Sequence, residues 1–236
     1  MNLLYVSGHR FIKCTNGEIY TTGQMGENYF ARFKQSFDRV TVIGFYEEEI
    51  SKNKSRKIEK IAKDSTFLSY CLIKSSEVPI FRNVFTSYKI MRTFKSLIKS
   101  YDIIATKAPS FVSSYAVKIA KKKQIPCYVE LVGCPWDAYW NHSWNGKLVA
   151  PFMWYATKKA VKNAPYVLYV TNDFLQRRYP STGRTINCSN VALPTLDESV
   201  LDVRLHKIKQ MTKYKPIVLG TTAAVDVRYK GQEYVI

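Results

Sequence analysis

The sequence is poor in the residues that build metal centres and disulfide frameworks. Its five cysteines, at positions 14, 71, 127, 134 and 188, are odd in number and form no Cys-x-x-Cys pair. The three histidines are His9, His142 and His206, and no His-Glu-x-x-His motif is present. We therefore expect a reducing, cytoplasmic environment, no structural zinc and no other metal site.

Long apolar runs are also missing. No run reaches the roughly 18 residues that a membrane-spanning helix needs, so we expect no span. The first residues, MNLLYVSGHR, have neither the charged region nor the long apolar region of a signal peptide. Their short apolar run instead predicts a first β-strand.

Acidic residues are scarce, with 18 Asp and Glu against 36 Lys and Arg, which gives a formal net charge of +18. Such an excess indicates an anionic partner: nucleic acid, an anionic membrane surface or a phosphorylated substrate. Because no nucleic-acid-binding motif accompanies the charge, we expect no nucleic-acid partner.

Short apolar runs alternate with helical patterns along the chain, and 46% of the residues are hydrophobic. We predict six strands, at Asn2–Val6, Arg39–Phe45, Asp102–Thr106, Cys127–Val132, Tyr166–Val170 and Thr185–Cys188. Helices are predicted between them, at 26–37, 84–101, 110–123, 147–163 and 173–179, and the charged stretch 47–63 is predicted as a loop with a short helix. This alternation is typical of an α/β protein with a doubly wound, mostly parallel, Rossmann-like sheet.

The stretch from Pro126 to Asn145 carries the strongest functional signal. A predicted strand ends there at Gly133, and acids, a histidine and large aromatics follow it. Ligands of parallel α/β sheets bind just outside the carboxyl ends of strands. We therefore predict a crevice whose catalytic candidates are Asp137, His142 and Glu130. The alternative is an aromatic-rich core segment, in which Glu130 is a buried, paired structural acid.

Large aromatic side chains surround these acids, and Trp136, Tyr139 and Trp140 are candidates for stacking on a ligand. On the same edge we expect the long loop after the first strand, which extends to Met25 and contains Gly17 and Glu18. Glycine permits a phosphate to approach the backbone closely. An ordinary strand-to-helix connection explains this loop equally well.

A basic stripe marks the predicted helix 84–101, where Lys89, Arg92, Lys95 and Lys99 share one face. The stripe is either a docking surface for an anionic membrane or an ordinary solvated surface.

Three segments together resemble the retaining nucleotide-sugar glycosyltransferases of family 4: ELVGCPWDAYWNHSW, YVLYVTNDFLQRRYPSTGRTINCSNVALP and IVLGTTAAVDVRYKGQEYVI. That family has the GT-B fold of two facing Rossmann domains. The resemblance implies an acceptor-binding domain at 1–195, a helical connector at 196–214 and, at 215–236, the first strand of a donor-binding domain whose remainder is missing. It also implies that Arg228, Lys230 and Gly231, together with Gly17 and Glu18 of the first long loop, approach the donor phosphates. The aromatics Trp136, Tyr139 and Trp140 are then expected to contact the acceptor.

The resemblance further implies sugar transfer from a nucleotide-sugar donor to a glycan or lipid-linked acceptor, without a metal or other cofactor. Many family members act at membrane surfaces, which suits the net charge and predicts a cytoplasmic protein that can associate peripherally with the membrane. The chain departs from the family pattern at Thr221, where an arginine is common, and at Gly133–Cys134, where a histidine is common. The alternative function is a non-catalytic module that binds a glycan, a partner chain or an anionic membrane.

Overall fold

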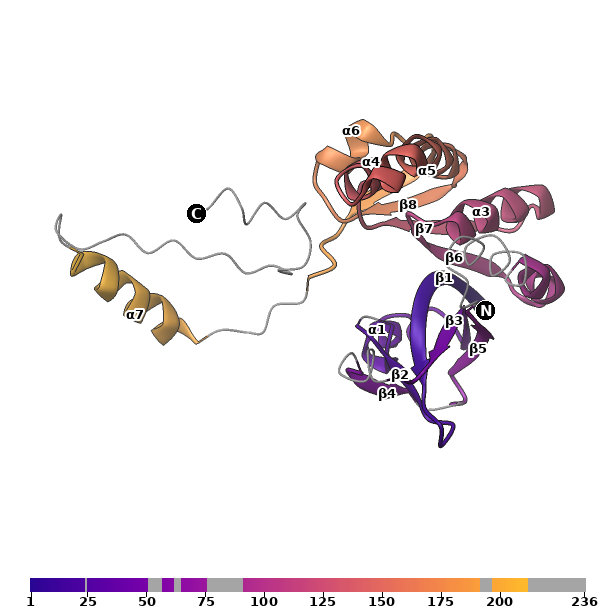
Figure 1. Ribbon diagram of the computed structural model, residues 1–236, viewed down its shortest axis with the longest axis horizontal. Helices are drawn as coiled ribbons and strands as arrows, with labels where there is room; N and C mark the ends of the chain where they lie inside the picture. Colours follow the sequence, from indigo (N-terminus) through magenta and orange to yellow (C-terminus); the bar gives the residue numbers. More distant parts are fainter. Residues whose placement is uncertain (24, 51–56, 62–64, 76–90, 192–196, 212–236) are drawn as a thin grey trace.

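In a computed structural model, the chain folds around one mixed sheet that has helices on both faces (Figure 1). The structure describes all residues except 24, 51–56, 62–64, 76–90, 192–196 and 212–236. The predicted strand at 216–220, the first part of the predicted helix 84–101 and Lys89 lie outside the described residues.

Seven parallel strands form the body of the sheet, in the order β5-β3-β1-β6-β7-β8-β9. They are β1 (Asn2–Lys13), β3 (Arg39–Glu48), β5 (Leu68–Lys74), β6 (Ile103–Ala108), β7 (Cys127–Leu131), β8 (Tyr166–Tyr169) and β9 (Arg184–Asn187). Two short strands, β2 (Ile19–Thr21) and β4 (Glu59–Ile61), extend the sheet in antiparallel pairing. The predicted fold class, a mostly parallel Rossmann-like sheet, is confirmed.

The alternation of side chains along β1 divides the core between the two faces of the sheet. Leu4 and Val6 pack with residues of α3 (Phe111–Lys123) and α5 (Trp144–Asn163), and the helical residues 91–97 with the 3-10 turn Ile98–Ser100 join the same cluster. Leu3 and Tyr5 pack on the opposite face, which α1 (Glu27–Ala31) covers through Phe30. Helices on both faces are what a buried parallel sheet requires.

α4 (Pro135–Trp140) and α5 follow β7 and pack against each other, and α5 also packs against α3; we call α4, α5 and α6 (Phe174–Arg178) the helical layer. α4 has a proline at its first helical position, and α5 begins after the capping residue Ser143. A Cβ atom at Gly146 would lie 2.1 Å from the carbonyl oxygen of Tyr139, so only glycine allows α5 to start this close to α4. α7 (Glu198–Lys209) follows α6 in the chain, and no residue of α7 is buried.

Three element predictions need correction. β1 does not end at Val6 but continues to Lys13, because Phe11 and Ile12 are buried and extend the apolar strand beyond its polar interruption. The predicted helix 26–37 is regular only in α1, and turns follow it. In the stretch 47–63, β3 reaches Glu48 and the described residues Glu59–Ile61 form β4 instead of a helix.

Candidate functional site

A crevice lies at the point where the strand order of the sheet reverses. β1 pairs with β3 on one side and with β6 on the other, so the chain passes from one half of the sheet to the other between β1 and β6. Ligands of open α/β sheets bind outside the carboxyl ends of the strands at such a switch point. The crevice has a volume of about 400 Å³ and is lined by Ser7, Gly8, His9, Met25, Lys107, Ala108, Pro109, Ser110 and Val132.

An irregularity in β1 shapes one wall of this crevice. The register of β1 against β3 shifts between Val6 and Arg10, so Ser7, Gly8 and His9 leave the regular ladder. The backbone N–H of His9 donates to Ser7 Oγ at 3.1 Å, and its ring Nε2 lies 3.1 Å from Thr21 Oγ1. Gly8 faces Ser110, whose Cβ would lie 3.4 Å from a Cβ at position 8. A side chain larger than alanine at position 8 would therefore fill the crevice.

The opposite wall is the end of β6 and the beginning of α3. Ser110 caps α3, because its Oγ accepts from the backbone N–H of Ser113 at 2.9 Å. The Oγ of Ser113 accepts from the backbone N–H of Ser110 in turn, which completes a capping box. Lys107 lies on the same wall, 5.1 Å from the centre of the Tyr29 ring, and burial lowers the pKa of its ammonium group. A cation and the positive end of a helix thus face the crevice, which suits a ligand rich in hydroxyl or phosphate oxygens.

Glu130 lies beneath this edge, inside the sheet, with only 3% of its surface exposed. Its carboxylate accepts hydrogen bonds from the hydroxyls of Tyr5 at 3.2 Å, Tyr29 at 2.5 Å and Tyr128 at 3.0 Å. The guanidinium of Arg32 completes the set with an ion pair. This placement favours the structural interpretation of Glu130 over the catalytic one, because four donors from β1, α1 and β7 already surround its oxygens.

This arrangement makes the tyrosine hydroxyls weaker acids. Burial raises the pKa of Tyr29 and of Tyr128 well above the ordinary value, and the nearby negative charge of Glu130 raises both further. All three phenols therefore remain protonated donors at physiological pH. We call Glu130, Arg32, Tyr5, Tyr29 and Tyr128 the tyrosine–glutamate cluster.

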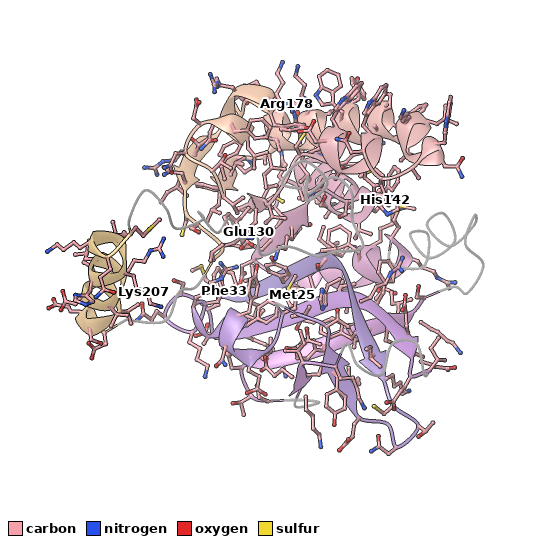
Figure 2. The ribbon with its side chains drawn as sticks, turned by 60° about the vertical axis from the view of Figure 1, so that its left-hand side comes forward. Met25, Phe33, Glu130, His142, Arg178 and Lys207 are labelled. Atoms are coloured by element: carbon pink, nitrogen blue, oxygen red, sulfur yellow. The ribbon has the colours of Figure 1, made fainter. Side chains whose placement is uncertain are left out.

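Asp137 occupies a different environment, on α4 in the layer beyond the end of β7. Its Oδ2 accepts from Nη1 of Arg178 on α6 at 2.7 Å, and both side chains are about half-exposed. His142 lies in the turn between α4 and α5 and is exposed. Figure 2 shows Glu130 near the centre of the molecule, with Arg178 and His142 toward the helical layer. The three polar candidates thus occupy separate positions along one stretch of chain.

The predicted acceptor-binding aromatics lie on α4. The rings of Trp136 and Trp140 stack with centres 5.1 Å apart, and Trp154 of α5 meets Trp136 edge-on at 6.4 Å. Burial raises the pKa of Tyr139. Trp140 keeps a partly exposed face, so it is the ring of the three that a sugar can reach most directly.

Gly17 and Glu18 lie in the hairpin between β1 and β2. Because β1 continues to Lys13, this hairpin lies beyond the crevice. Gly17 has a φ of 80°, a conformation that the turn requires, and its N–H donates to the carbonyl of Cys14 at 2.9 Å. Glu18 pairs with Lys60, which lowers the pKa of Glu18 to about 2. Among the described residues, Ser7–His9 line the crevice at the position predicted for Gly17 and Glu18. Arg228, Lys230 and Gly231 lie outside the described residues.

The sequence reasoning missed Ser7, Gly8 and Ser110 as crevice residues. A signal was present, because small polar residues follow both the first predicted strand and the strand at 102–106. Parallel strands end at the same edge, so these two positions had to converge. Within the described part of the chain, no three His, Cys, Asp or Glu side chains gather in a way that could hold a metal ion. No described helix is long and apolar enough to cross a bilayer.

Comparison with solved structures relates this fold to sucrose-phosphate synthase from Thermosynechococcus elongatus, at a TM-score of 0.51 and 11% sequence identity. The similarity covers 86% of this chain and 53% of the synthase chain. Over the aligned residues, which are about half of the synthase, this chain has a GT-B-like fold. A ugt transferase from Siraitia grosvenorii in complex with UDP aligns over 90% of this chain and 56% of its own, at 10% identity and a TM-score of 0.42.

Among curated proteins, Protein CapJ of Staphylococcus aureus is 35% identical to this chain over 155 residues. The matched stretch is 65% of this chain but only 37% of CapJ, so the chain spans well under two thirds of this relative's length. No family model matches the sequence.

Proposed function

We propose that this chain is the acceptor-binding part of a glycosyltransferase, which transfers a sugar from a nucleotide-sugar donor to a glycan or lipid-linked acceptor in surface polysaccharide synthesis. The main support is the crevice at the switch point between β1 and β6, with Lys107 and Ser110 on its wall. The GT-B glycosyltransferase-like fold and the similarity to CapJ agree with this proposal.

The proposal places the acceptor in this crevice and assigns further acceptor contacts to the helices that follow β7. Asp137 and His142 are half-exposed or exposed and can hydrogen-bond sugar hydroxyls, while the partly exposed ring of Trp140 can pack against a sugar. Glu130 is proposed as a positioning residue, because its hydrogen bonds hold β7 against β1 and α1. Gly17 and Glu18 receive no role, because their hairpin is closed by the ion pair to Lys60.

Donor binding is proposed for the segment with Arg228, Lys230 and Gly231, as the family resemblance implies. Sugar transfer releases a nucleoside diphosphate, and cationic side chains and backbone amides stabilise the charge that develops on it. The domain organisation at 1–195, 196–214 and 215–236 belongs to the same proposal.

The test measures the binding of a panel of oligosaccharides to the purified protein by saturation-transfer NMR. We expect at least one oligosaccharide to bind, Gly8→Leu to weaken its binding about tenfold or more by filling the crevice, and Gly8→Ala to leave it nearly unchanged. Equal binding by Gly8→Leu and the natural protein would contradict the crevice as the acceptor site.

A second measurement separates the enzyme from the non-catalytic module. The protein is incubated with the bound oligosaccharide and a panel of nucleotide sugars, and the products are analysed by mass spectrometry. A sugar added to the oligosaccharide supports the transferase. Binding without any transfer across the panel would show that this chain does not transfer a sugar by itself, as expected of an acceptor-binding part alone or of the binding module.

A further inference from the structure

The outer face of α5 carries four large apolar side chains that point away from the sheet. Trp144, Leu148, Phe152 and Tyr155 are 80%, 67%, 73% and 62% exposed. Their spacing of four, four and three residues places them on one side of the helix. In Figure 2, the side chains of this helical layer project outward, away from the strands. A contiguous apolar row of this kind marks an interaction surface, unlike single exposed apolar residues.

Lysines flank this row. Lys147 Nζ lies 5.7 Å from the ring centre of Trp140 and 5.5 Å from that of Trp144, and Lys159 Nζ lies 5.9 Å from that of Tyr155. A groove of about 490 Å³ between α3 and α5 adds Lys118 and Lys121 to Lys159. Neither α3 nor α5 contains an aspartate or a glutamate. The surface therefore combines apolar rings with uncompensated positive charge from two helices.

The basic surface continues beyond the groove. Tyr115 lines the groove, and Lys95 Nζ lies 5.9 Å from its ring centre. Lys95 and the exposed residues Arg92 and Lys99 belong to the basic stripe predicted from the sequence. The stripe thus joins the α3–α5 surface and extends its positive charge.

An anionic bilayer matches this combination better than other partners do. Tryptophan and tyrosine favour the boundary between head groups and acyl chains, and lysine stems reach along apolar surface to phosphates. A helix that lies in the interface plane typically has an apolar face bordered by lysines. A second copy of the chain would bring an equally positive, acid-free surface against this one, which repulsion disfavours. A nucleic-acid backbone offers no apolar surface to Leu148 and Phe152.

We propose that α5 and the α3–α5 groove form a membrane-docking face for anionic phospholipid. Trp144, Leu148 and Phe152 enter the interface, and the groove lysines contact lipid phosphates. α4, which begins at the carboxyl edge of the sheet, packs against α5, so docking brings that edge to the bilayer surface. The inference does not rest on the proposed sugar transfer, and its test needs neither a donor nor an acceptor.

The test is co-sedimentation of the purified chain with vesicles of pure phosphatidylcholine or of phosphatidylcholine containing phosphatidylglycerol. The natural protein is expected to bind the anionic vesicles and to bind the neutral ones weakly. The double variant Trp144→Ser/Phe152→Ser is expected to lower the partition coefficient at least about tenfold. Lys118→Gln/Lys121→Gln/Lys159→Gln is expected to lower it as well and to flatten its dependence on salt.

Matched controls come from α7, which also has exposed apolar and basic side chains. Leu201→Ser/Leu205→Ser and Lys207→Gln/Lys209→Gln are expected to leave vesicle binding unchanged. Circular dichroism establishes that each variant is folded. In addition, tryptophan fluorescence of the natural protein is expected to shift to shorter wavelength with anionic vesicles, and the shift should be lost in the tryptophan variant.

Three results would overturn the inference. The first is an absence of binding to phosphatidylglycerol vesicles by the natural protein, and the second is equal binding by the α5 and α7 variants. The third is a dimer, seen by analytical ultracentrifugation, that Trp144→Ser/Phe152→Ser dissociates while vesicle binding is unchanged. That third result would assign the face to contact between copies of the chain.

Discussion

Glu130 and Asp137 are carboxylates on either side of the end of β7, and each pairs with an arginine. Glu130 lies inside the sheet, 3% exposed, with three phenols and Arg32 around it. Asp137 lies in the helical layer, half-exposed, with Arg178 of α6 as its partner. The same type of pair therefore serves two regions that differ in solvent access.

Burial, and not residue type, therefore separates the structural acid from the acid that is a candidate for the site. A buried carboxylate needs its full set of donors, so the tyrosine–glutamate cluster leaves little freedom for Glu130 to meet a ligand. A half-exposed carboxylate keeps access to solvent and exchanges partners at little cost. Substitutions in the two regions should therefore differ in their effect on the free energy of unfolding.

The largest expected effect is the loss of Glu130. Glu130→Ala removes charge-assisted hydrogen bonds to the phenols and leaves Arg32 without its partner. We expect the free energy of unfolding to fall by about 2–4 kcal/mol, a value reduced because Arg32 is partly exposed. Urea denaturation followed by circular dichroism measures it, with Asp137→Ala as the control at about 1 kcal/mol or less. Similar losses from both substitutions would remove the contrast.

The second effect appears at alkaline pH. The folded-state pKa values of Tyr29 and Tyr128 are raised by burial above the unfolded value near 10. The full stability is present below about pH 10, and above it the unfolded chain loses phenol protons that the folded chain keeps. The free energy of unfolding should then fall by up to about 1.4 kcal/mol per pH unit for each tyrosine.

Urea unfolding at several pH values between about 8 and 11 checks this dependence. Tyr128→Phe should make the decline above pH 10 less steep. Tyr155→Phe, at an exposed position on α5, should leave the slope as it is. An equal slope in the natural protein and Tyr128→Phe would show that the cluster does not control alkaline stability.

The smallest effect on stability is expected at Asp137. Asp137→Asn weakens the half-exposed pair with Arg178 and should cost about 0.5 kcal/mol, while it lowers oligosaccharide binding or sugar transfer if Asp137 contacts the acceptor. Asp173→Asn is the matched control, because Asp173 also pairs with an arginine, Arg177, at an exposed position on α6. Full binding and transfer in Asp137→Asn would exclude Asp137 from the site.

Much of the fold could be predicted from local patterns. The six expected strands are all present, and the helices expected at 110–123 and 147–163 agree with α3 and α5 within a few residues. Apolar runs that are buried on both faces leave a signal in the sequence itself. The extension of β1 to Lys13 left a weaker signal, because Ser7, Gly8 and His9 interrupt its apolar run at the register shift.

The candidate site was predicted less completely. The strand pattern predicts that polar residues beyond β7 lie near the carboxyl edge. It also allowed Glu130, inside a strand, to be a buried and paired acid, but it could not name the partners of Glu130. These partners include Tyr5 and Tyr29, which are distant along the chain and meet Glu130 only after the sheet has formed. Gly17 was assigned to the crevice because the length of β1 was underestimated.

The sequence by itself determined the α/β class, the excess of positive charge and the concentration of aromatics after β7, because composition and short-range periodicity carry these properties. Tertiary structure decided which aromatics surround Glu130 and which remain exposed on α5. It also decided that Ser7–His9 and Ser110 share one crevice. The physical reason is that burial and convergence depend on contacts between strands and helices far apart in the chain, which no local pattern records.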